Sequence, residues 1–219
     1  VVNNYGKEEI LFLGPDEGTA HVMEWAALYA KKRGYSYWRA FTTGKPSSLG
    51  GIPHDTFGMT TTSVHRYVVG CVEKLGLKEE ECTKIQTGGP DGDLGSNEIL
   101  ISKDKTIAVI DGSGVAYDPN GLNREELTRL AKARVMVENF DKSKLSASGF
   151  FVSVNDTNVT LPHGEKVESG VTFRNDFHLH PLARADLFVP CGGRPESVNL
   201  SNVKNLFDAK TGKPKFKVI

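Results

Sequence analysis

Two carboxylates, Asp16 and Glu17, stand where an apolar run breaks and a helix is predicted to begin. The run, residues 10–13, has the length and composition of a buried strand, and Gly14-Pro15 ends it because proline has no N–H for a strand ladder. A carboxylate held at a strand end beside the positive end of a helix suits proton transfer. It equally suits an ordinary helix cap, and spacing alone favours the cap for Asp16.

A glycine-rich turn, residues 88–95, lies between two predicted strands at 83–87 and 105–111. Strand, glycine turn, short helix, strand and acidic end form the outline of a dinucleotide-binding βαβ unit. The glycines of such a unit let the backbone approach a pyrophosphate at a helix N-terminus. Asp111 follows the turn by about 20 residues, where a carboxylate would bind the ribose hydroxyls of NAD and repel a 2′-phosphate.

A second glycine turn, Cys191-Gly192-Gly193, follows a strand predicted at 185–190. Because the carboxyl ends of neighbouring parallel strands meet at one edge of a sheet, both turns are expected at the same ligand-binding edge. Cys191 has no base paired with it in the sequence, so it is not predicted to be a nucleophile. His178 and His180 alternate in a predicted strand but lack a third ligand, so no metal site is predicted.

The elements that position these residues alternate between strands and helices. Helices are predicted at 19–33, from the hydroxyl-rich run 60–63 to residue 75, and at 124–138; strand-forming residues at 150–154 and 159–161 predict a β-hairpin. The Gly/Ser/Pro-rich segment 44–51 predicts a loop, and we place a domain hinge there. We therefore expect an α/β fold: a Rossmann-like, doubly wound, mostly parallel sheet with flanking helices and a β-hairpin insertion.

Composition sets the class of protein. The 219 residues contain 38% hydrophobic residues and equal numbers of basic and acidic residues, 27 each, so no nucleic-acid or anionic-membrane partner is expected. The apolar runs are too short to span a bilayer. Three cysteines without metal-like spacing predict reduced thiols and a cytoplasmic protein, with a mitochondrial location left open. The start at Val1 and the strand-like end at 215–219 predict a piece of a longer polypeptide, truncated at its C-terminus.

Four motifs in one order carry a family resemblance. They are Gly14-Pro15-Asp16-Glu17-Gly18-Thr19, Thr43-Gly44-Lys45-Pro46 with Gly50-Gly51, Asp111 followed by Tyr117-Asp118-Pro119-Asn120-Gly121, and Asp186-Leu187-Phe188-Val189-Pro190-Cys191. Over nearly the whole chain this order resembles the glutamate dehydrogenase family, and the 88–95 turn resembles its large, NAD-specific fungal-type members.

The resemblance implies a role for each matching position. Asp16 would be the catalytic aspartate that exchanges protons with the substrate amino group, and Thr43 and Thr60 would lie on the substrate and nicotinamide side. Gly89, Gly92 and Gly95 would cradle the pyrophosphate, Asp111 would hold the adenosine ribose, and Cys191-Gly192-Gly193 would lie against the dinucleotide. The implied reaction converts L-glutamate, NAD and water to 2-oxoglutarate, ammonium and NADH, in a full-length enzyme that is a homo-oligomer.

The resemblance also implies a domain division: residues 1–43 would be the trailing strand and helix of a substrate domain, and 44–219 the NAD-binding domain. The family's catalytic lysines belong upstream of residue 1, so this fragment alone is expected to be inactive. Two alternatives stay open: a non-catalytic dinucleotide-binding or regulatory module, and a related amino-acid dehydrogenase with another side-chain specificity. Asp93 departs from the family pattern, in which an uncharged residue is common at this position. A carboxylate near a pyrophosphate is unfavourable unless it points away or is paired.

Overall fold

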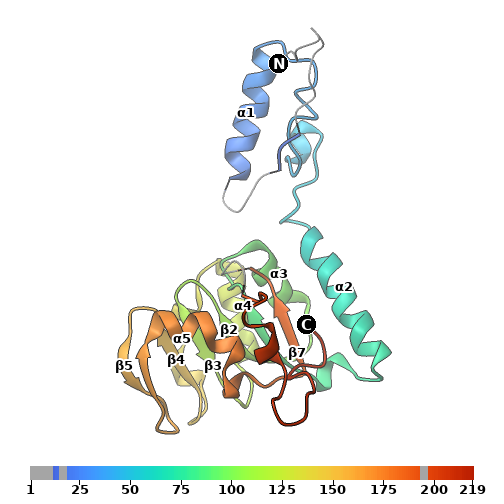
Figure 1. Ribbon diagram of the computed structural model, residues 1–219. Helices are drawn as coiled ribbons and strands as arrows, with labels where there is room; N and C mark the ends of the chain where they lie inside the picture. Colours follow the sequence, from blue (N-terminus) through green and yellow to red (C-terminus); the bar gives the residue numbers. More distant parts are fainter. Residues whose placement is uncertain (1–11, 15–18, 193–196) are drawn as a thin grey trace. The chain divides into compact units, whose positions relative to one another are not determined.

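The chain divides into two units, Val1–Thr60 and Thr61–Ile219. Figure 1 shows the computed structural model, which describes residues 12–14, 19–192 and 197–219. The predicted domain boundary at 43/44 lies inside the first unit.

The first unit contains the long helix α1, Ala20–Lys32, which confirms the helix predicted at 19–33. Lys31 and Lys32 lie in its last turn, where positive charge offsets the negative end of the helix dipole. Next to the helix, Leu13 forms a parallel bridge with Thr42, and its N–H donates to Phe41 O over 2.9 Å. Of the strand predicted at 10–13, only residues 12 and 13 fall within the described part of the chain.

The second unit is built on a five-stranded mixed sheet with the order β4-β3-β2-β1-β7. Its strands are β1 (Thr83–Thr87), β2 (Lys105–Ile110), β3 (Gly114–Tyr117), β4 (Phe150–Ser153) and β7 (Leu187–Pro190). The strands β7, β1 and β2 are parallel, and β3 and β4 extend the sheet in antiparallel fashion beyond β2. The parallel part is the predicted Rossmann-like core, and β1 has the predicted bounds.

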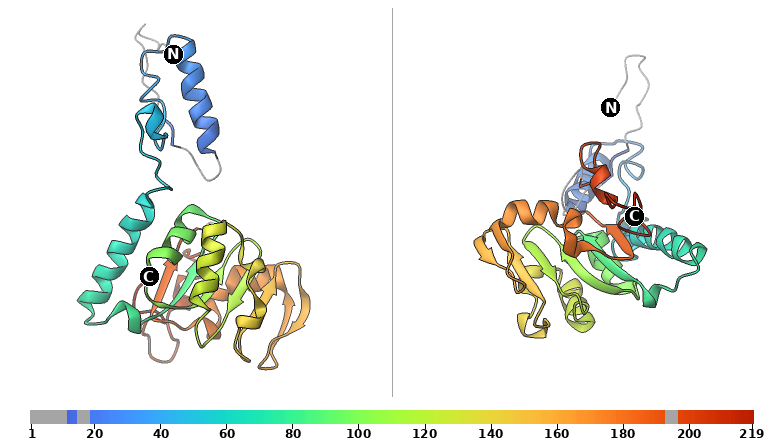
Figure 2. Two further views of the ribbon diagram at one scale, coloured as in Figure 1. Left: turned by 180° about the vertical axis from the view of Figure 1, so that it is seen from behind. Right: turned by 60° about the horizontal axis from the view of Figure 1, so that its bottom comes forward.

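Helices cover both faces of this sheet, and the right-hand view of Figure 2 shows α4 and α5 on opposite sides of it. Their bounds are α2 (Met59–Lys74), α3 (Asp93–Ile101), α4 (Arg124–Ala133) and α5 (Gly170–Asp176). Side chains alternate between the faces: Phe188 packs with the α5 side, whereas its neighbours Leu187 and Val189 pack against Val68 and Val72 of α2. The helix predicted to run from 60–63 to 75 is therefore confirmed as α2.

The predicted β-hairpin between 150–154 and 159–161 has the wrong strand partners. Residues 150–153 form β4 and pair with β3, whereas β5, Thr157–Thr160, pairs with β6, Lys166–Ser169. Burial explains the choice, because Phe150 and Val152 enter the core while three of the four β5 residues are exposed. A β-hairpin insertion exists, but it consists of β5 and β6.

The helix predicted at 124–138 is shorter in the structure. Its start is fixed by Asn123, whose side chain accepts a hydrogen bond from Glu126 N over 2.9 Å. It ends at Ala133 because Arg134 adopts a left-handed backbone conformation with φ 53°. The turn brings Val137 into the core, in the 3₁₀ helix Val137–Asn139.

The predicted strand around His178 and His180 is also wrong, because His178 lies in a 3₁₀ helix, Phe177–Leu179, and Pro181 begins another. The remaining 3₁₀ helices are Ser47–Leu49, Glu79–Glu81, Lys142–Lys144, Pro181–Ala183 and Val203–Leu206. Within the part of the chain that the structure describes, none of the helices has the length and apolar character needed to cross a bilayer.

Candidate functional site

The carboxyl ends of β7, β1 and β2 meet at one edge of the sheet, where the first residue after β7 and the first residue after β1 each donate to the last residue of the neighbouring strand. Cys191 N donates to Thr87 O over 2.6 Å, and Gly88 N donates to Ile110 O over 2.9 Å. The structure therefore brings together the glycine turn after β1, Asp111 after β2 and the turn after β7. These are three of the segments that the sequence predicts for a common ligand edge.

Three glycines of the 88–95 turn leave no room for a Cβ atom, two of them because backbone atoms approach closely and Gly89 because carboxylate side chains do. A Cβ on Gly88, where φ is +88°, would collide with Cys191 O, and one on Gly95 would collide with Gly89 O. A Cβ on Gly89 would meet the carboxylates of Asp91 and Asp111. Gly88 was not among the predicted site residues, although it is as sterically constrained as Gly89 and Gly95.

Gly92 has a different role, as the residue that precedes α3. Its φ of −86° is open to any residue, so its own backbone conformation does not require a glycine. The first bond of the helix runs from Ser96 N to Gly92 O over 2.9 Å, and among the described residues no side chain caps this helix end. Helix starts of this kind carry N–H groups and a positive dipole end that suit an anion.

The extra carboxylate of the turn, Asp93, is paired. Its Oδ1 lies 3.1 Å from Arg134 Nη1. Arg134 is the residue with left-handed backbone conformation that ends α4. The paired arrangement is the condition under which a carboxylate is acceptable near a phosphate. The neighbouring Asp91 is less readily ionised, since burial and the charge of Asp111 raise its pKa above the usual value.

Asp111 is 3% exposed and fixes the segment that follows β2. Its Oδ1 accepts from Ser113 N and Ser113 Oγ, over 2.8 and 2.6 Å, and its Oδ2 accepts from Val137 N over 2.8 Å. Because a carboxylate has about four lone-pair sites, these bonds leave acceptor capacity at Oδ2. The carboxylate therefore fixes the turn between β2 and β3 while lying beside Gly89.

Cys191 is a packing residue at this edge. Its side chain is buried, and burial raises the pKa of the thiol far above its usual value. A thiol in that state is a poor nucleophile, in line with the interpretation made from the sequence. Gly192 follows with φ +113°, whereas the predicted site residues Gly193 and Asp16 lie outside the described residues.

The two threonines predicted for the substrate side belong to the first unit. Thr43 Oγ1 lies 3.1 Å from His54 Nε2, so the hydroxyl is engaged within its own unit. Thr60 is exposed near the start of α2. Among the described residues, no group of three or more His, Cys, Asp or Glu side chains is arranged to hold a metal ion.

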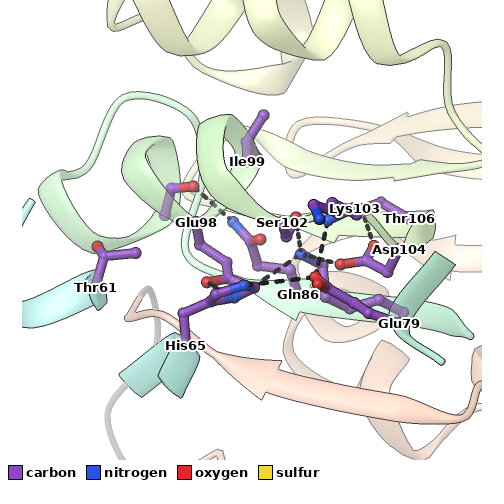
Figure 3. Close-up of polar contacts among 12 residues, drawn as sticks. Thr61, His65, Glu79, Gln86, Glu98, Ile99, Ser102, Lys103, Asp104 and Thr106 are labelled. Carbon is purple, nitrogen blue, oxygen red and sulfur yellow. Dashed lines mark hydrogen bonds and ion pairs between the residues drawn. The ribbon is translucent and has the colours of Figure 1, made fainter. Parts of the chain in front are cut away.

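A buried charge network below the turn was not predicted. Lys84 Nζ lies 3.2 Å from Glu98 Oε1 and 2.9 Å from Asp104 Oδ2, and it donates to Ser102 Oγ over 2.9 Å. His65 Nδ1 of α2 lies 3.2 Å from Glu98 Oε2. Figure 3 shows these contacts, which join α2, β1 and α3.

The network balances opposite charges. The hydrogen bond to Glu98 raises the pKa of His65, against a smaller effect of burial. Burial acts to lower the pKa of Lys84, but the charges of Asp104 and Glu98 outweigh it and raise that pKa. One signal for the network is in the sequence, because Lys84 and Gln86 alternate with apolar Ile85 and must share a face of the strand.

Comparisons with known proteins place the sequence in one family. Residues 50–217 match the model of the family described as Glutamate/Leucine/Phenylalanine/Valine dehydrogenase. The chain is 64% identical over 219 residues to "Glutamate dehydrogenase 2" of Dictyostelium discoideum, covering all of this chain and 21% of that protein. It is 57% identical over 213 residues to the "NAD-specific glutamate dehydrogenase" of Neurospora crassa, covering 97% of this chain and 20% of that protein. The chain thus spans about a fifth of the length of these relatives.

Solved structures agree on the fold. Plasmodium falciparum glutamate dehydrogenase superposes with a TM-score of 0.60 at 18% identity, covering 89% of this chain and 37% of the other. The hetero-hexameric glutamate dehydrogenase of Thermus thermophilus superposes with a TM-score of 0.55 at 20% identity, covering 89% and 39%. At these identities the superpositions establish the α/β fold.

Proposed function

This chain belongs to the Glutamate/Leucine/Phenylalanine/Valine dehydrogenase family, and we propose that it forms the cofactor-binding part of an NAD-dependent glutamate dehydrogenase. The proposed reaction of the full-length enzyme converts L-glutamate, NAD and water to 2-oxoglutarate, ammonium, NADH and a proton. The observation that carries the proposal is the glycine turn at the sheet edge. Cβ atoms on Gly88, Gly89 and Gly95 would fill or distort it, and Asp111 lies against Gly89.

The residues at the edge fit a dinucleotide. We propose that Gly89, Gly92 and Gly95 face the pyrophosphate, where the start of α3 supplies N–H donors and a positive dipole end. The pairing of Asp93 with Arg134 supports this role, because it offsets a negative charge that would otherwise repel phosphate. Cys191, Gly192 and Gly193 would lie against the cofactor from the neighbouring strand.

Asp111 is proposed to hold the adenosine ribose and to exclude a 2′-phosphate. Its position beside Gly89 and the bonds that fix its orientation support both roles. When bound, NAD supplies the acceptor for the hydride that leaves the substrate α-carbon. Asp16 is proposed to carry protons to and from the substrate amino group, with Thr43 and Thr60 on the substrate and nicotinamide side.

The test is made on the full-length protein. Titration with NADH, followed by nucleotide fluorescence, should give saturable binding, and glutamate with NAD should give NADH. Asp16→Asn should lower kcat by about 10²–10⁴-fold, the range for loss of a general acid–base group, while NADH binding is retained. Retained turnover in Asp16→Asn would remove Asp16 from its role. The 219-residue chain alone should not oxidise glutamate, and NADH production by it would contradict the proposed need for residues outside this chain.

The family description includes leucine, phenylalanine and valine dehydrogenases, so the substrate is tested directly. We propose glutamate because the printed names of the relatives at 64% and 57% identity are those of glutamate dehydrogenases. A panel of these four amino acids at equal concentration should give the highest kcat/KM for glutamate. We further propose that the full-length enzyme is a cytoplasmic homo-oligomer, which light scattering on the purified enzyme and localisation of a tagged protein would test.

A further inference from the structure

Gln86 joins the two ends of the glycine turn from below. Its side chain lies in β1 and is fully buried, with 0% exposure. The amide Nε2 donates to Gly88 O over 2.9 Å and to Gly95 O over 3.0 Å. Gly88 opens the turn and Gly95 lies in the first turn of α3, so one amide group connects them. Figure 3 shows Gln86 beside the residues of the buried charge network.

The orientation of this amide is determined by its partners. If Gln86 were flipped, Oε1 would face two carbonyl oxygens and both hydrogen bonds would be lost. In the observed orientation both hydrogens of Nε2 are used, whereas Oε1 is buried with no hydrogen-bond partner among the described residues. An unbranched apolar side chain would avoid that unsatisfied acceptor, so packing alone does not explain a glutamine here.

Holding the two carbonyl groups has a consequence for the donors of the turn. In the trans peptide between Gly88 and Gly89, the C=O and N–H groups point in opposite directions. A Gly88 carbonyl directed at Gln86 therefore aims Gly89 N–H away from Gln86. The bond to Gly95 O fixes the start of α3 relative to the same amide.

We infer that Gln86 is a positioning residue for the phosphate-binding turn, setting cofactor affinity through Gly88 and Gly95 without touching the cofactor. This inference rests on the proposed function, because the ligand of the turn is taken to be NAD. Independently of the ligand's identity, Gln86, which lies beneath the turn, sets the direction of the N–H donors of the turn.

The test compares Gln86→Met with wild type in the full-length protein. Methionine keeps the unbranched shape and removes both donors and the unsatisfied acceptor. We expect the Kd for NADH and the KM for NAD to rise at least about tenfold, since two hydrogen bonds are lost, while kcat at saturating NAD stays within about twofold. Gln86→Glu, which retains size and, when protonated, one donor, should recover part of the affinity.

Thr106→Val is the matched control. Thr106 is buried in the neighbouring strand β2, and its Oγ1 donates to Asp104 Oδ1 over 2.7 Å, away from the turn. It should lower the denaturation midpoint and leave the Kd for NADH unchanged. A purely structural role for Gln86 would give the same result in Gln86→Met, and that result would overturn the inference.

Hydrogen exchange of the ligand-free proteins separates this inference from the proposed function. Amides of residues 88–95 should exchange at least about tenfold faster in Gln86→Met than in wild type or Thr106→Val. If the wild type fails to bind NADH, the proposed function falls, and exchange still decides whether Gln86 orders the turn. Unchanged exchange in Gln86→Met would overturn the positioning role whether or not NADH binds.

Discussion

Lys84 Nζ lies 2.9 Å from Asp104 Oδ2, and neither side chain reaches solvent. Glu98 lies on the other side of the ammonium group at 3.2 Å, and His65 of α2 approaches Glu98 in turn. Glu79 Oε1 also lies 3.6 Å from His65 Nε2, so when His65 is protonated two positive charges face three carboxylates. Because charges removed from water are tolerated when they are paired and hydrogen-bonded, each member depends on the others.

Replacing Lys84 should therefore destabilise the second unit strongly. Lys84→Met leaves Asp104 and Glu98 buried without their cation, and we expect the free energy of unfolding to fall by about 3–5 kcal/mol. Lys103→Met is the control, because Lys103 lies 3.6 Å from Glu80 and both side chains are more than half exposed; it should cost less than about 1 kcal/mol. Urea denaturation measures both, and equal losses would refute the assigned importance of the buried pair.

His65 should make stability depend on pH above its unfolded-state pKa. The folded pKa of His65 is raised, chiefly by the hydrogen bond to Glu98, with Glu79 adding attraction and burial and Lys84 opposing it. A raised folded pKa means that the contribution is fully present below about pH 6.5 and is lost as pH rises through the folded value.

The difference in unfolding free energy between wild type and His65→Asn isolates this contribution. It should be on the order of 1 kcal/mol at pH 6 and shrink as pH rises toward 9. His21→Asn, at an exposed position of α1, is the control and should change stability little at any of these pH values. A difference that does not vary with pH would show that His65 acts only by packing.

Gly95→Ala should disrupt the turn. The added Cβ would collide with the backbone oxygens of Gly89 and Gly88, so we expect a loss of about 1–3 kcal/mol in stability and weaker NADH binding. Gly70→Ala is the matched helical control, since a Cβ there meets no atom within 4 Å. It should stabilise α2 by about 0.5–1 kcal/mol and leave NADH binding unchanged. Thermal denaturation and NADH titration compare the two variants. Equal stability and equal NADH affinity in Gly95→Ala and Gly70→Ala would show that the turn accommodates a methyl group.

Asp111→Ser should narrow the preference for NAD over NADP. Removal of a carboxylate beside a 2′-phosphate relieves a repulsion of about 1 kcal/mol or more, so the ratio of kcat/KM values should fall by about fivefold to tenfold. Asp118→Ser is the control: Asp118 is also buried and accepts from Ser146 N over 2.6 Å, but it follows β3 and lies away from the carboxyl ends of the parallel strands. Its variant should lose stability with an unchanged ratio. An unchanged ratio in Asp111→Ser would assign cofactor choice to another group.

The three cysteines should differ in reactivity. Cys71 is exposed, whereas Cys82 and Cys191 are buried and burial raises the pKa of both thiols. A disulfide reagent should therefore modify about one thiol quickly in the native protein and all three after denaturation. In Cys71→Ser the fast phase should disappear. A fast phase that survives this substitution would show that a buried thiol is accessible.

The sequence predicted the elements whose pattern is local. The five residues of β1 and the glycines at 88–95 are recognisable from the local sequence alone. The pattern of a buried strand after a glycine turn also places Asp111 correctly at the sheet edge. The β3 strand was not predicted because its four residues are too few to show a period. Without β3, the partner of β4 was assigned to residues 159–161 instead.

Long-range pairing explains the other differences. The helix α4 ends at Arg134, which forms an ion pair with Asp93, 41 residues earlier in the sequence. Local sequence rules do not predict a partner at that separation. Lys84 and Gln86 could be assigned to one face of β1, but their partners come from α2, α3 and the turn. Of the predicted site residues, Asp16 and Gly193 lie outside the described part of the chain, so their roles stay predictions.

The hydrogen bonds that hold the glycine turn have a thermodynamic consequence for ligand binding. Gly88 N is bound to Ile110 O, and the carbonyls of Gly88 and Gly95 are bound to Gln86, before any ligand arrives. A dinucleotide that docks on such a turn does not have to order it, so association is spared the conformational entropy that a mobile loop would lose. Under the proposed function, this preorganisation would contribute to the affinity for the dinucleotide, and Gln86 would supply part of it before the ligand binds.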